Sequence, residues 1–100
     1  MRITIHRRGG FAGIDELVAD LETGALTETD REMAETAVRH LGFFGLAPTP
    51  ADEMIGADML RTELTVEDAD RVHRVAYTDQ SGNAAEPLRR FVERIKAVAR

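Results

Sequence analysis

The sequence predicts an α+β fold in which a four-stranded antiparallel sheet carries two main helices on one face, in the order ββα-ββα. Four segments alternate between apolar and polar residues, glycine or polar turns separate the two strands of each pair, and apolar residues at helical spacing follow each pair. This pattern is typical of an antiparallel α+β sandwich. With 100 residues the chain has the size of one domain, so we expect a single domain spanning 1–100.

The first strand pair is predicted on both sides of a glycine-rich turn. Over residues 2–7, Ile3 and Ile5 alternate with polar residues, as in a half-buried strand. Three glycines within segment 9–13 allow a sharp reversal of the chain. The second strand is expected to turn three side chains to one face, namely Leu17, Ala19 and Leu21.

The first helix is predicted to begin at the capping box Thr29-Asp30-Arg31-Glu32, where a hydroxyl and a carboxylate satisfy the free N–H groups of the first turn. Gly42 or Gly45 is expected to end it, and the aromatic residues that follow should fix its end to the core. The segment 48–52 contains two prolines and is predicted to be a linker.

The second half repeats the order of elements without repeating the residues. Alternation resumes over 59–66, a polar turn is expected at 67–70, and another strand over 72–77. The last helix is predicted to start at Pro87, which suits a first helical position. Its apolar face is formed by Leu88, Phe91, Val92, Ile95 and Val98.

Composition excludes several classes of protein. Acidic residues outnumber basic ones by 18 to 13, giving a net charge of −5, which argues against a nucleic-acid partner. The absence of cysteine rules out a disulfide scaffold, a thiolate zinc site and a cysteine nucleophile. No apolar run is long enough to span a membrane, and no signal-peptide pattern opens the sequence, so we expect a soluble cytoplasmic protein.

Catalytic signatures are weak, and we expect a protein that is not an enzyme. Ser81 lies in a predicted turn without a nucleophile elbow. The histidines lack metal-ligand spacing; His6 and His73 are interpreted as surface residues on a polar sheet face, and His40 as a favourable cation near a helix C-terminus. The acidic pairs fall in loops or at element ends, where solvated turn charges are the simpler interpretation.

The glycine-rich turn is the most informative segment. Gly9-Gly10-Phe11-Ala12-Gly13 does not match a phosphate-binding loop, because the glycine spacing differs and a strand follows. Two interpretations stay open from the residues alone. Phe11 packs back onto the sheet, or the loop projects so that Phe11 or Ile14 fills the pocket of a partner.

The opening strand Ile3-Thr4-Ile5, followed by Gly9-Gly10-Phe11-Ala12-Gly13-Ile14, resembles the signature of the emfourin family. These are small bacterial inhibitors of protealysin-like peptidases, a branch of the thermolysin-like zinc metallopeptidases. Gly56-Ala57-Asp58-Met59, His73 in the next predicted strand and Pro87-Leu88-Arg89 extend the resemblance. The chain departs from the family pattern at Arg7-Arg8, which is more basic, and over 61–63, which lacks an aromatic residue.

The resemblance implies a protein inhibitor of a thermolysin-like zinc metallopeptidase that blocks the active-site cleft and needs no cofactor of its own, the zinc belonging to the target. The implied contact residues are Gly9, Gly10, Phe11, Ala12, Gly13, Ile14 and Asp15. Zinc ligation by a backbone carbonyl or by Asp15-Glu16, steric blocking without zinc contact, and contact through the 47–58 linker stay open. The alternative class is a protein- or peptide-binding module without inhibitory activity.

Overall fold

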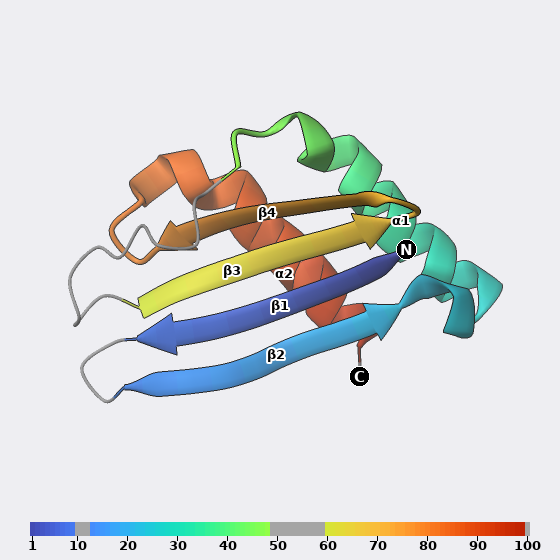
Figure 1. The fold of residues 1–100 in the computed structure, drawn as a ribbon, viewed down its shortest axis with the longest axis horizontal. Coiled ribbons are helices and arrows are strands. Elements are labelled where there is room, and N and C mark those ends of the chain that lie inside the picture. The colour runs from blue at the N-terminus through green and yellow to red at the C-terminus, as the bar shows by residue number, and fades with distance from the viewer. Residues whose placement is uncertain (10–12, 49–59, 100) are drawn as a thin grey trace.

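The computed structural model describes residues 1–9, 13–48 and 60–99, and in these ranges it confirms the predicted α+β architecture (Figure 1). One antiparallel sheet has the strand order β2-β1-β3-β4. The strands are β1 (Arg2–Gly9), β2 (Ile14–Glu22), β3 (Leu60–Asp68) and β4 (Arg71–Thr78). The helices are α1 (Glu28–Leu41) and α2 (Glu86–Val98), with short 3-10 turns at Thr23–Ala25, Phe43–Gly45 and Gly82–Ala85.

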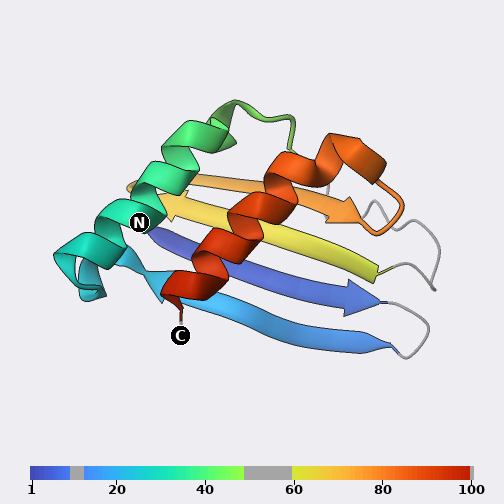
Figure 2. The same ribbon diagram turned by 180° about the vertical axis from the view of Figure 1, so that it is seen from behind.

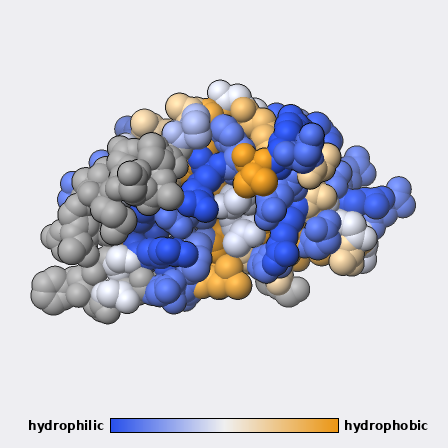
Figure 3. Space-filling model, viewed as in Figure 1, coloured by the Kyte–Doolittle hydropathy of each residue, from blue (hydrophilic) through white to orange (hydrophobic). Residues whose placement is uncertain are grey.

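Both helices cover the same face of the sheet, as Figure 2 shows. The core lies between these two layers and is built from alternate strand residues and the inner helix faces. Ile3, Ile5 and Leu64 of the central strands are fully buried, as is Ile95 of α2. We call the opposite side of the sheet, on which neither helix packs, the open face. It carries the other set of alternate residues, and Figure 3 shows that it is mainly hydrophilic.

The prediction for Leu17 is wrong, because the pairing of β1 with β2 contains a β-bulge. Ile5 is the partner of Ala19 and His6 is the partner of Leu17, so Val18 is an extra residue in β2. An extra residue reverses the alternation on one side of the bulge. Ala19 and Leu21 are therefore buried as predicted, whereas Leu17 lies on the open face.

The caps of α1 differ from the prediction at one end. Thr27, not Thr29, is the N-cap residue, and its hydroxyl accepts a hydrogen bond of 3.2 Å from the Asp30 N–H. The helix therefore begins two residues earlier, with Glu28 and Asp30 in its first turn next to the positive end of the helix dipole. Gly42 ends the helix in the left-handed conformation, with φ 65°, as one of the two predicted stops.

The turn between β3 and β4 is shorter than predicted. The strands stay paired through Asp68 and Arg71, which also form an ion pair of 3.3 Å, and leave only residues 69–70 in the turn. Polar residues at 67 and 68 thus belong to a strand, because a solvent-facing hairpin end tolerates them. The helix at the C-terminal end begins at Glu86 with Pro87 in its first turn, close to the prediction. Among the described residues, no helix is both long and apolar enough to cross a membrane.

Candidate partner-binding site

The glycine-rich connection forms the tip of the β1–β2 hairpin. Gly9 and Ile14 are the last paired residues, so residues 10–13 make the connection. Gly9 and Gly13 have φ values of 90° and 66°, a backbone conformation that glycine adopts without steric cost. Gly10, Phe11 and Ala12 lie outside the described residues, as does the side chain of Ile14. The structure therefore describes only the base of the predicted loop, and the two interpretations of Phe11 stay predictions.

The start of β3 lies beside this hairpin. Leu60, the first residue of β3, is the β-sheet partner of Gly9 and therefore lies next to the hairpin base (Figure 1). Segment 49–59, including the Gly56–Met59 motif, lies outside the described residues. Contact through the 47–58 linker therefore stays a prediction.

A group of charged side chains lies on the open face at the hairpin base. His6 Nε2 lies 2.6 Å from Asp15 Oδ1, joining the two strands of the hairpin directly. Arg8 extends the contact, with Nη2 at 3.3 Å from His6 Nδ1 and Nε at 4.0 Å from Asp15 Oδ1. These contacts fix the carboxylate of Asp15, a predicted contact residue, on its own chain.

Glu63 of β3 links this group to a second arginine. Arg8 and Arg61 are direct cross-strand partners, an arrangement that is unfavourable for two like charges. One carboxylate oxygen of Glu63 lies 3.6 Å from Arg8 Nε, and the other lies 3.1 Å from Arg61 Nε. The Arg61 and Glu63 side chains are only 10% and 12% exposed, whereas Arg8 is 55% exposed, so solvent screens the Arg61–Glu63 contact less than the contacts of Arg8.

The far end of the open face has a separate ion pair. The Arg2 guanidinium donates two hydrogen bonds to Asp20, of 2.9 and 2.7 Å. These hydrogen bonds, aided by the positive charge, lower the pKa of Asp20, while partial burial opposes the change. The same pair raises the pKa of Arg2. The geometry is bidentate, which is the strongest form of such a pair at a surface.

The two strand histidines do not lie together, and the interpretation of His73 as a residue of the polar face is wrong. His6 is on the open face, but His73 is on the helix-covered face. Its Nε2 lies 2.8 Å from the Leu46 carbonyl oxygen, and its ring packs against Phe43 and Phe44. His73 thus fixes the chain that leaves α1, which is a structural role. His40 lies in the last turn of α1, as predicted.

The described residues contain no metal-binding cluster. No group of three or more His, Asp or Glu side chains in the described ranges could hold a metal ion. The Ser81 hydroxyl accepts a hydrogen bond of 3.0 Å from the Thr78 N–H, within the turn that follows β4. The charged groups at the hairpin base join neighbouring strands.

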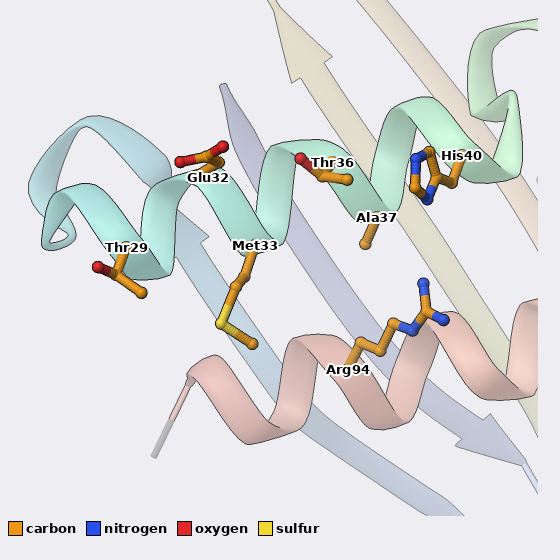
Figure 4. Close-up of a pocket in the computed structure, with 7 residues that line it drawn as sticks. All are labelled: Thr29, Glu32, Met33, Thr36, Ala37, His40 and Arg94. Carbon is orange, nitrogen blue, oxygen red and sulfur yellow. The ribbon is translucent and has the colours of Figure 1, made fainter.

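A groove of about 530 Å³ runs between α1 and α2 (Figure 4). Met33 points from α1 toward α2, and Arg94 points back toward Ala37 and His40. Glu32 and Thr36 also line the groove. This mixture of one carboxylate, two basic groups and a methionine lies on the exposed side of the helical layer. It is typical of solvated helix surfaces, and the hairpin end is the stronger candidate site.

Comparison with known proteins identifies the family of the chain. A family model described as Emfourin matches residues 5–96, which is most of the chain. The chain belongs to the emfourin family. The match covers the whole sheet beyond residue 4, including the glycine hairpin, and nearly all of α2. No curated protein and no solved structure matches the chain.

Membership of the emfourin family supports a metallopeptidase-inhibitor role at the level of the family. At that level the family implies a metallopeptidase partner. Two features of this emfourin were not found from the sequence. The ion group of Arg61 and Glu63 depends on the register of β1 and β3, and the exposure of Leu17 depends on the bulge. For the ion group, the sequence shows only that charged residues such as Arg61 and Glu63 lie in a segment predicted to be a strand.

Proposed function

We propose that this emfourin inhibits a thermolysin-like, protealysin-like zinc metallopeptidase by inserting its β1–β2 hairpin into the active-site cleft. The proposed contact residues are Gly9, Gly10, Phe11, Ala12, Gly13, Ile14 and Asp15. Family membership over residues 5–96 supports the class of target. The observation that carries the choice of segment is the paired base of the hairpin, where Gly9 pairs with Ile14 and Asp15 contacts His6 across the strands.

The hairpin base lowers the entropic cost of binding. A flexible loop must be ordered when it enters a cleft, whereas a loop held at both ends has lost much of that freedom already. Gly9 and Ile14 are paired, and His6, Arg8 and Asp15 tie the strands together just before the tip. The two strand ends that lead into residues 10–13 are therefore already paired before binding.

Steric blocking is favoured over zinc ligation by Asp15. Asp15 Oδ1 already contacts His6 Nε2 at 2.6 Å and lies 4.0 Å from Arg8 Nε. Zinc ligation through this oxygen would have to displace both contacts. We therefore propose that Phe11 or Ile14 occupies the apolar pocket that such peptidases have next to the scissile bond, and that the backbone excludes substrate.

The test is a titration of thermolysin and of a protealysin-like peptidase with the purified protein, measuring peptide hydrolysis. Stoichiometric loss of activity that persists when zinc is added supports inhibition and excludes chelation. Phe11→Ala is expected to weaken inhibition by orders of magnitude while the far-ultraviolet circular dichroism stays unchanged. No inhibition of either enzyme at about 10 μM, far above the nanomolar range of good protein inhibitors, would favour a binding module without inhibitory activity.

A further inference from the structure

We infer that Leu17 is a second contact residue for the same peptidase. Together with the hairpin tip, it determines which peptidases the protein inhibits. This inference rests on the proposed function. Leu17 is a large apolar side chain with 56% of its surface exposed, on the open face of the edge strand β2. It lies three residues from Ile14, where the hairpin tip joins the strand.

The bulge is the reason that Leu17 faces outward. With regular alternation, Leu17 would point to the same side as Ala19 and Leu21 and would join the core. The extra residue Val18 turns it to the open face, while Val18 itself packs partly against the core. Bulges at sheet edges commonly redirect a side chain toward a functional surface. The fold thus places a leucine in solvent at the one end of β2 from which the proposed contact loop extends.

The surroundings of Leu17 suit an apolar contact. Its cross-strand partner is His6, whose ring nitrogens are engaged by Asp15 and Arg8. Asp15, on the same face of β2, is held by those two residues. Charges that are already paired within the chain need no new partner when a protein covers them, so burying this region costs less than burying unpaired charges.

The kind of partner surface follows from these observations. A peptidase whose cleft accepts the tip of the hairpin must bring its rim against the first residues of β2, because only Asp15 and Glu16 separate Leu17 from Ile14. The matching surface is an apolar side chain or shallow apolar depression on that rim. A peptidase with a charged group there would be rejected, since Leu17 would desolvate it without offering a hydrogen bond.

Val72 provides a matched control. It is an exposed aliphatic residue, 66% accessible, on the open face of the other edge strand, β4. Its cross-strand partner is Glu67. The partner of Glu67 on β1 is Arg2, which lies at the end of the sheet away from the hairpin tip. Leu17→Ser and Val72→Ser therefore make the same type of change on the same face, at opposite ends.

The experiment compares the inhibition constants of the wild type, Leu17→Ser, Leu17→Met and Val72→Ser against one protealysin-like peptidase. We expect Leu17→Ser to inhibit about 10- to 100-fold more weakly, the range for losing the burial of one leucine. Leu17→Met should stay within about threefold of the wild type, since it conserves volume and apolar character. Val72→Ser should leave inhibition unchanged.

The outcomes separate this inference from the proposed function. If the wild type inhibits and Leu17→Ser inhibits equally well, the inference is wrong and the proposed function stands. If Leu17→Ser and Val72→Ser weaken inhibition equally, the inference is also wrong, because the effect is not local. If the wild type does not inhibit, both fail. Urea unfolding of each variant completes the test, and a large loss of stability in Leu17→Ser would assign Leu17 to the core instead.

Discussion

The two halves of the β1–β2 hairpin are stabilised in different ways. In the far half, next to the chain termini, Ile3 and Ile5 face Leu21, Ala19, Val66 and Leu64 in a buried apolar layer. In the near half, from His6 to the tip, the side chains that join the strands are charged. The boundary in the β1–β2 pairing is the bulge after Ile5. One half of the hairpin therefore supplies apolar burial, and the other is joined by charged contacts on the open face.

This division has a simple physical basis. Apolar burial is not directional and needs a covering layer, which the helices supply over Ile3 and Ile5. A contact surface must stay uncovered in the free protein, so its order has to come from directional contacts between neighbouring strands. We therefore expect substitutions in the two halves to change stability by different amounts, with the largest loss in the buried layer of the far half.

The largest effect is expected in the far half. Ile5→Ala should lower the free energy of unfolding by about 3 kcal/mol, because Ile5 is fully buried and the cavity left behind cannot collapse completely. Urea unfolding followed by circular dichroism measures this loss. Leu17→Ala, in the same hairpin but exposed, should change stability by less than about 0.5 kcal/mol. If the two variants lost similar amounts of unfolding free energy, apolar burial would not distinguish the far half from the near half.

Glu63→Gln should have the next largest effect. Its carboxylate lies between Arg8 and Arg61, which face each other on neighbouring strands. Without the negative charge, the largely buried Arg61 guanidinium loses its charged contact with Glu63, at a cost of about 2 kcal/mol. Glu67→Gln is the control, since Glu67 is exposed on the same face of the same strand. Equal urea midpoints for the two variants would mean that Glu63 does not support the near half.

Gly13→Ala tests the backbone of the tip. Gly13 has a φ of 66°, and a Cβ atom there would meet nothing within 4 Å, so the cost is conformational and not steric crowding. We expect a loss of about 1 kcal/mol. Gly45 also has free space for a Cβ but no positive φ. Gly45→Ala should therefore be neutral or slightly stabilising. A neutral Gly13→Ala would contradict the requirement for a left-handed residue at the tip.

The smallest effect concerns the surface ion pair of the far half. Hydrogen bonds from Arg2 lower the pKa of Asp20, so the folded state favours the carboxylate more than the unfolded state does. The pair therefore stabilises the protein above the ordinary pKa of aspartic acid, about 4, and this contribution is lost as the pH falls below that value. Asp20→Asn should reduce stability slightly at neutral pH, and the difference from the wild type should vanish in acid. A pH-independent difference in urea midpoints would contradict this assignment.

The sequence allowed the architecture to be predicted because alternation, caps and glycines act over short distances. Alternation of Ile3 and Ile5 with polar residues gave the core face of β1, and the apolar stripe from Leu88 to Val98 gave the inner face of α2. The errors were small where two local signals competed. Thr27 and Thr29 both precede acidic residues by three positions, and the tertiary structure selects Thr27 as the cap.

The site could be predicted only in part. The glycine hairpin was recognised from its residues and from a family resemblance, and membership of the emfourin family is confirmed. The support of the hairpin was not predictable, because Arg8, Arg61 and Glu63 are distant in sequence and meet only through the register of β1 and β3. The same holds for Leu17, whose direction depends on one extra residue in the pairing with β1.

The sequence by itself thus determined the order of strands and helices, the buried face of most elements and the family of the protein, since these follow from local periodicity and from a short motif. The tertiary structure alone decided which face Leu17 takes, which charges meet at the hairpin base and that His73 is a core contact. These features depend on register, and a shift of one residue in a strand reverses every side chain beyond it.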